Sequence, residues 1–121
     1  MGVRAWLATP PGARPVSMIK GIQCTGAGPH KLVDGVDGRV VLVTRVNAQI
    51  HNADTVVRLV AFKGDESTGE VLHGDRRVAQ GDVLDLIDAA EAPVGHGVGI
   101  VIDNPAAAIG GSIAFYAVDE G

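Results

Sequence analysis

Glycine and proline divide this chain into segments that are too short for long helices. The 121 residues include 17 Gly and 6 Pro, which are spread between apolar stretches rather than gathered at one end. Both residue types are poor helix formers, and both are common in turns. The spacing therefore predicts many short strands joined by turns.

The composition fits one domain with its own core. Hydrophobic residues make up 46% of the chain, and aromatic residues only 3%, so we expect a core built from Val, Ile, Leu and Ala. No apolar run reaches the roughly 20 residues that cross a bilayer, and the N-terminus lacks the apolar stretch of a signal peptide. We therefore expect no membrane partner. The lone Cys24 excludes an internal disulfide.

The strand pattern predicts an antiparallel β-sandwich or jelly roll of about eight short strands. Apolar or alternating runs of strand length are bounded by Gly, Asp and Pro, and a one-turn helix is conceivable only over residues 88–92. The expected strands cover residues 16–24, 39–50, 55–63, 83–87, 98–103 and 112–118, and the short polar stretches 70–74 and 76–82 are expected to be an edge strand and its connection. The stretches "GAGPHK", "DGVDG" and "GDESTG" are expected to be turns or loops.

The run "RVVLVTRVNAQI" (39–50) alternates with a period of two. Its even positions, from Val40 to Ile50, are expected on one face, and its odd positions on the other. The next run, "TVVRLVAFK" (55–63), follows after "HNAD" (51–54). We therefore expect residues 39–63 to form a long hairpin with "HNAD" as its turn.

The first 15 residues have a different character. Pro10, Pro11 and Pro15 prevent a helix, so we predict an extended arm over residues 1–15, followed by a single β-sandwich domain over residues 16–121. Trp6 and Leu7 are apolar side chains in this arm that need cover. Either their own domain or a neighbouring subunit could provide it.

The charge is unevenly distributed along the sequence. Residues 1–63 contain eight Lys or Arg and three Asp or Glu, whereas residues 64–121 contain two and eleven. The net charge of −4 argues against a nucleic-acid partner. The two halves could be two solvated faces of one domain, or they could polarise a subunit that docks on complementary charge. In the second case Arg45 and Arg58 on one part, and Asp82, Asp85 and Glu91 on another, would set the orientation.

The residues that could carry chemistry do not form a recognisable motif. The four histidines lie at or beside turns and include no His-x-His pair, and Cys24 ends an apolar strand, where a small buried side chain is expected. The acidic residues fit solvated loops and strand edges, where they discourage unwanted strand pairing. We therefore expect no catalytic residue, no metal site and no cofactor, and hence no enzyme.

The segment "GRVVLVTRVNAQIHNADTVVRLVAF", followed by "RVAQGDVLDLI", "HGVGIVID" and "GSIAFYAV", resembles the small β-sandwich accessory proteins of tailed-phage particles. In those proteins an apolar strand ends in a polar bend, here at Asn47 or Asn52. A Gly-Asp step, here Gly81–Asp82, then starts a new strand, and a Gly-flanked strand closes the sheet. The resemblance covers roughly residues 38–118.

This resemblance implies a capsid decoration (cement) protein on the outside of the virion. Such proteins bind the major capsid protein at junctions between capsomers, often as trimers whose extended arms hold neighbouring copies. It implies partner contacts by Trp6, Leu7 and Arg14 of the arm and by Arg45 and Arg58. Two alternatives stay open: a tail, baseplate or fibre accessory or receptor-binding domain, and a carbohydrate-binding or cupin-like domain.

Overall fold

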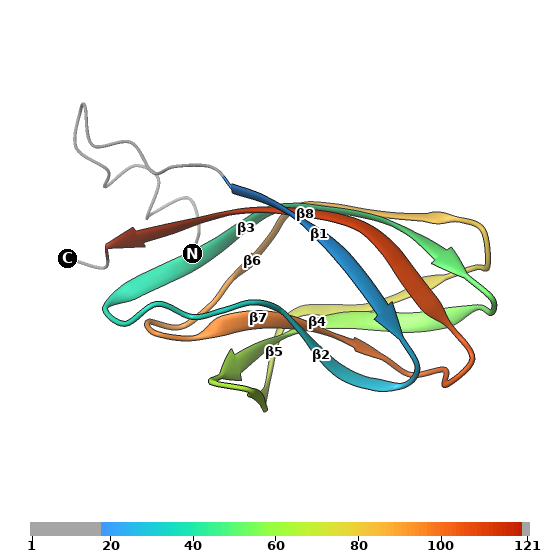
Figure 1. The fold of residues 1–121 in the computed structure, drawn as a ribbon, viewed down its shortest axis with the longest axis horizontal. Helices are drawn as coiled ribbons and strands as arrows, with labels where there is room; N and C mark the ends of the chain where they lie inside the picture. Colours follow the sequence, from blue (N-terminus) through green and yellow to red (C-terminus); the bar gives the residue numbers. More distant parts are fainter. Residues whose placement is uncertain (1–17, 120–121) are drawn as a thin grey trace.

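The chain forms an all-β sandwich of eight strands (Figure 1). The computed structural model describes residues 18–119, and none of them is helical. The strands are β1 (Met18–Thr25), β2 (Gly28–Val33), β3 (Arg39–His51), β4 (Thr55–Lys63), β5 (Glu66–Val78), β6 (Val83–Glu91), β7 (Gly97–Ile102) and β8 (Ala108–Asp119). The predicted all-β class and strand number are confirmed. The predicted arm, residues 1–15, lies outside the described residues.

The strands form two antiparallel four-stranded sheets that lie one over the other (Figure 1). Sheet A has the order β1-β8-β3-β6 and sheet B the order β2-β7-β4-β5. The antiparallel pairs β1–β8, β2–β7, β3–β6 and β4–β5 are nested. The chain is thus one long double-stranded ribbon, folded over so that alternate pairs enter alternate sheets. This is the jelly-roll form of the β-sandwich.

The bend after β3 is a crossover between the sheets. The hairpin expected over residues 39–63 is wrong, because β3 belongs to sheet A and β4 to sheet B. The bend does need residues that tolerate tight geometry, since Asn52 has a φ of 74°. Two alternating strands joined by a short polar bend give the same sequence pattern in a hairpin and in a crossover, so the pattern alone could not separate them.

A β-bulge at Thr44 interrupts the alternation of β3. The pairing with β8 passes from Val43–Phe115 to Arg45–Ala114, which leaves Thr44 as an extra residue. Odd positions such as Val43 therefore face the core before the bulge, and even positions such as Val46 face it afterwards. The expectation that all even positions share one face is wrong for the first half of the strand.

Several strand boundaries also differ from expectation. β2 begins inside the stretch "GAGPHK", and β5 is one strand that begins inside the stretch "GDESTG". Residues 83–91 are all in β6 rather than ending in a helical turn, and Asp88 within it has a φ of 50°. Gly and polar residues in these stretches are compatible with irregular edge strands, which is why they were expected to be loops.

The core lies between the sheets and is almost entirely aliphatic. Each fully buried Val, Leu or Ile contributes roughly 1.5–3 kcal/mol of transfer free energy. The largest side chains that are both in this core and fully buried are Ile50, Leu59, Leu84, Ile100, Ile102, Ile109 and Ile113.

The described residues include no helix that could span a membrane.

Backbone hydrogen bonds hold the crossovers of the ribbon together at both ends of the sandwich. At one end Gly81 donates to the carbonyl of Ile50 over 2.8 Å, which joins the β5–β6 loop to the end of β3. At the other end Gly95 donates to the carbonyl of Arg39 over 2.9 Å, which joins the β6–β7 loop to the start of β3. At both ends of the sandwich, therefore, the loops are joined in the same nested order as the strands that they connect.

Candidate interaction surface

The outer face of sheet A is divided into an apolar half and a polar half. Residues paired across antiparallel strands share a face, so the register defines rows across the sheet. The apolar rows are Val118–Val40, Tyr116–Leu42–Glu91 and Ile19–Ala114–Arg45–Ile87. The polar rows are Gly21–Ser112–Asn47–Asp85, Gln23–Gly110–Gln49–Val83 and Thr25–Ala108–His51.

Exposed apolar side chains mark both edges of the apolar half. Ile19 on β1 is 77% exposed, and Ile87 on β6 is 70% exposed. Both belong to the same row, with Ala114 and Arg45 between them. Leu42, in the next row, points away from the core but is only 1% exposed. Exposed apolar side chains on both edges of one sheet face make this face the candidate contact surface.

Arg45 forms a two-point ion pair with Asp85 on this face. Its Nε and Nη2 atoms lie 3.0 and 3.2 Å from the two carboxylate oxygens of Asp85. The hydrogen bonds from Arg45 hold the pKa of Asp85 below its ordinary value, and those to Asp85 raise the pKa of Arg45. The expectation that these two residues lie on separate parts of the molecule is wrong, because β3 and β6 are neighbours.

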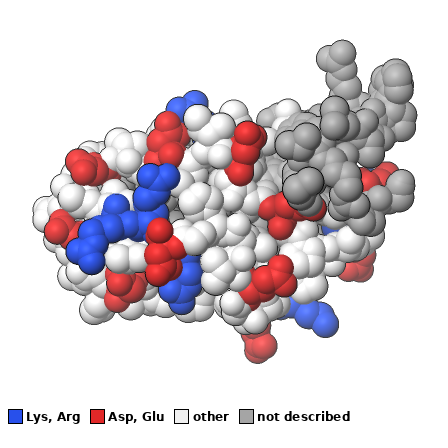
Figure 2. Space-filling model, turned by 180° about the vertical axis from the view of Figure 1, so that it is seen from behind, with Lys and Arg blue, Asp and Glu red and all other residues white. Residues whose placement is uncertain are grey.

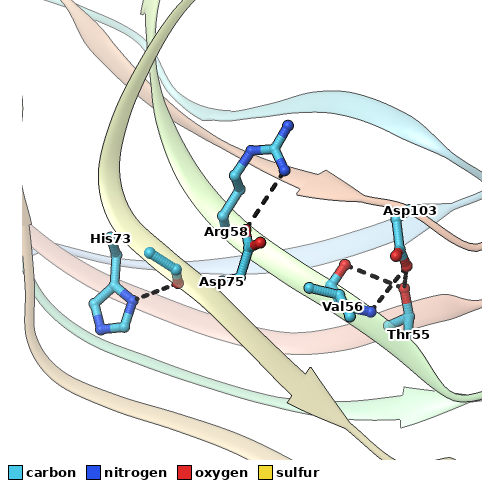
Figure 3. A network of polar contacts seen from close by, with 7 residues as sticks. Thr55, Val56, Arg58, His73, Asp75 and Asp103 are labelled. Carbon is cyan, nitrogen blue, oxygen red and sulfur yellow. Dashed lines mark hydrogen bonds and ion pairs between the residues drawn. The ribbon is translucent and has the colours of Figure 1, made fainter.

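Arg58 lies on the outer face of sheet B. On that strand the neighbouring positions Val57 and Leu59 face the core, so Arg58 points away from it. Its Nη1 atom lies 3.5 Å from Asp75 on β5 (Figure 3). The structure thus places Arg45 and Arg58 on opposite faces of the sandwich. The face seen in Figure 2 likewise shows basic and acidic side chains next to one another rather than separated.

A network of polar groups closes the end of the sandwich at the β3–β4 crossover. Thr55 and the backbone N–H of Val56 both donate to Oδ1 of Asp103, over 2.8 and 2.9 Å (Figure 3). These two bonds, that of Val56 first, lower the pKa of Asp103, and the charge of Arg77 adds to the effect. The Asn104 side chain donates to the carbonyl of Asp54 over 2.8 Å. These contacts tie two loops that are far apart in the sequence.

This network lines an open pocket of about 340 Å³. Its lining residues are Asp54, Thr55, Val56, Arg77, Asp103, Asn104 and Pro105. Oδ1 of Asp103 accepts both of these bonds, and the Thr55 hydroxyl accepts a bond from the N–H of Asn104. No Cys or His lines the pocket, so its lining pairs no thiol or imidazole with these carboxylates. Its groups hold the loops in place.

The remaining candidate residues lie apart from one another. Among residues 18–119 no group of three or more His, Cys, Asp and Glu could hold a metal ion. His30 and His96 each contact a backbone carbonyl close in sequence, those of Gly26 and Val94. Cys24 is buried, as expected, and burial raises the pKa of its thiol.

Sequence reasoning did not identify Ile19 and Ile87 as surface residues, although one signal was present. In β6 the core positions are Leu84 and Leu86, so the odd positions face outward. Ile87 is therefore an apolar residue at a position where alternation predicts a polar one. Of the predicted contact residues, Trp6, Leu7 and Arg14 lie outside the described residues.

No protein-family model matches the chain, and no curated protein matches it significantly.

Proposed function

We propose that this protein is a structural component of a phage or phage-like particle and acts as a decoration (cement) protein. It binds the outside of the assembled capsid, contacts the major capsid protein and copies of itself, as a trimer, and stabilises the shell. The observation that carries the proposal is the apolar half of the outer face of sheet A, which ends at Ile19 and Ile87. Jelly rolls are common among viral capsid proteins, which fits this role.

The contact surface in this proposal combines sheet A with the preceding arm. Arg45 lies in the same row as Ile19 and Ile87, so it provides polar contacts within the apolar half. The arm adds Trp6, Leu7 and Arg14. Arg58, on the opposite face, would contact a different neighbour. Many copies on one shell make weak individual contacts effective through avidity.

The test is co-sedimentation of the purified protein with undecorated, expanded capsid shells. We expect the wild-type chain to pellet with the shells and the double variant Ile19→Asp/Ile87→Asp to stay in the supernatant. The matched control is Val71→Asp, because Val71 is 50% exposed on β5 of the other sheet. Wild-type protein that stays in the supernatant would remove the proposal, and binding to host-cell surfaces instead would support the tail or fibre alternative.

Jelly rolls are also common in lectins and cupins, which supports the alternative of a carbohydrate-binding or cupin-like domain. Glycan binding by the purified chain, or stoichiometric zinc, iron or manganese in it, would favour a carbohydrate-binding or cupin-like domain. Light scattering of the same sample measures the oligomeric state. A trimer is expected for a protein that sits at a capsomer junction.

A further inference from the structure

We infer that copies of this chain associate edge to edge, with β1 of one copy paired antiparallel to β6 of the next. This pairing extends sheet A from each copy into its neighbour and brings Ile19 of one copy beside Ile87 of the next. It rests on the proposed function for its role on a shell, but the contact itself forms between copies of the free protein.

The two edges of sheet A are β1 and β6 (Figure 1). Among residues 18–119 each of them pairs with one strand, β1 with β8 and β6 with β3. Edge strands present backbone groups that can pair with a further strand. Since three antiparallel pairings separate β1 from β6, these two strands run in opposite directions. A β6 strand from a second copy can therefore continue the sheet beside β1 without a change in its alternating directions.

The edges of sheet A lack the protection that the edges of sheet B have. β2 contains Pro29 and a register shift between Lys31 and Val33, and the pairing of β5 with β4 shifts register three times. Proline and bulges both hinder the addition of a strand. By contrast, β1 pairs with β8 in one register along its whole length, and β6 keeps one register with β3 from Val83 to Ile87. Sheet A therefore has the more regular edges.

The most exposed large apolar side chains of these two edges lie in the same row of the sheet. Ile19 on β1 is 77% exposed and Ile87 on β6 is 70% exposed. When two copies join with their rows aligned, Ile87 of one copy lies beside Ile19 of the other. Each then covers apolar surface of its neighbour, which favours association. The same alignment places Gly21 beside Asp85 and Gln23 beside Val83.

Charge favours the pairing of unlike edges over the pairing of like edges. β1 contains one charged residue, Lys20, whereas β6 contains Asp85 and Asp88 and no Lys or Arg. Two β6 strands side by side would bring carboxylates together, and two β1 strands would bring lysines together, both of which are unfavourable. A β1–β6 pair instead joins a basic edge to an acidic edge.

Pairing of unlike edges is head-to-tail, so it closes into a ring or continues as an open filament. One strand pair is a small contact. In a ring, however, every copy uses both of its edges and is held by two such contacts, which makes the assembly more stable than one contact alone. A ring of three copies would be the trimer expected for the proposed function.

Single cysteine variants test the contact between Ile19 and Ile87. We expect Ile19→Cys and Ile87→Cys to remain monomers on non-reducing gels when each is oxidised alone. A mixture of the two variants, combined at low concentration, concentrated and then oxidised mildly, should give a disulfide-linked dimer. The wild-type chain is the control for Cys24, which is buried and should not form a link.

The matched control is a mixture of Ile19→Cys with Val83→Cys. Val83 is 55% exposed on the same face of β6, but it lies four residues, or about 14 Å, along the strand from Ile87. That distance is beyond the reach of a disulfide in the aligned pairing, so this mixture should give only the dimers expected from random collisions.

Light scattering without shells measures the association independently. Ile87→Asp should weaken self-association by at least about tenfold, because an apolar contact is replaced by a further carboxylate. Val71→Asp should leave it unchanged, since Val71 is 50% exposed on β5 of the other sheet. Circular dichroism shows whether each variant is folded, and Ile19→Asp replaces Ile87→Asp if the latter is not.

Three results would overturn the β1–β6 pairing. They are a wild-type chain that stays monomeric at all concentrations, equal dimer yields in the two mixtures, and strong dimer formation by either Ile19→Cys or Ile87→Cys alone. A monomer that pellets with shells would overturn the pairing and leave shell binding intact. A stable oligomer linked through residues 19 and 87 that does not pellet would support the pairing and remove the proposed function.

Discussion

The hydroxyl of Thr55 donates a hydrogen bond to Oδ1 of Asp103 over 2.8 Å, and this contact joins the crossover after β3 to the loop after β7. The N–H of Asn104 donates to the same hydroxyl over 3.3 Å. Thr55 is only 4% exposed, and it is the only buried polar residue among residues 18–119. A single side chain thus satisfies groups of two loops.

Replacing Thr55 by valine tests how much this contact contributes to the free energy of unfolding. Valine keeps the branched shape but removes the donor to Asp103 and the acceptor for Asn104. We expect the free energy of unfolding to fall by about 1–3 kcal/mol in urea titrations, because buried polar groups lose their partners. Thr25→Val, at an exposed position at the end of β1, should change stability by less than about 0.5 kcal/mol. Equal losses of stability in Thr55→Val and Thr25→Val would contradict a stabilising role for the hydrogen bonds of Thr55.

Stability should fall in acid partly through Asp103. The pKa of Asp103 is lowered in the folded chain from an ordinary value of 3.8. The unfolded chain therefore takes up a proton first, so the stabilisation is complete above pH 3.8 and is lost as the pH falls through the lower folded value. The variant Asp103→Asn should be less stable than wild type at neutral pH, and this difference should shrink on acidification. Urea titrations between about pH 2 and pH 7 measure both curves.

A methyl group at Gly111 should disrupt the pairing of β8 with β3. A Cβ there would overlap the carbonyl oxygen of Asn47 and the Cα of Ala48, which are backbone atoms that cannot swing away. We expect Gly111→Ala to cost about 1–3 kcal/mol of unfolding free energy. The neighbouring Gly110→Ala would meet only the ring of His51 at 3.9 Å, so its effect should be clearly smaller. A reversed order of the two variants would refute the packing argument.

The crossover after β3 should respond to substitutions of Asn52 according to backbone conformation. The φ of 74° is accessible to glycine and asparagine but strained for a β-branched residue. Asn52→Val should therefore lower the melting temperature, with a cost of about 1–2 kcal/mol, whereas Asn52→Gly should be nearly neutral. If both variants melt alike, the conformation of this residue does not limit stability.

The fold class was predictable from local signals, and the strand pairing was not. Turn residues and alternation identify strands, because both depend on a few neighbouring residues. Whether β3 pairs with β4 or crosses to the other sheet depends on contacts with β6 and β8, which are distant in the sequence. The bulge at Thr44 has the same origin, since it exists only in relation to the partner strands.

The interaction surface was only partly predictable for a related reason. Arg45 was singled out by its charge, but its partner Asp85 follows from the neighbouring positions of β3 and β6. Ile19 and Ile87 come from opposite edges of sheet A and form one row only through the register of four strands. Local alternation could mark Ile87 as unusual, but it could not show what lies beside it.

The nesting of the strands also determines how this chain can reach its native state. The β4–β5 pair is local and can close early, whereas the β1–β8 pair joins the two ends of the described chain and must wait until most intervening residues are ordered. Chains with such a high contact order fold slowly, on a scale of milliseconds to seconds. During that interval the partly folded β4 and β5 expose apolar surface at a sheet edge, so refolding yield should decline with protein concentration.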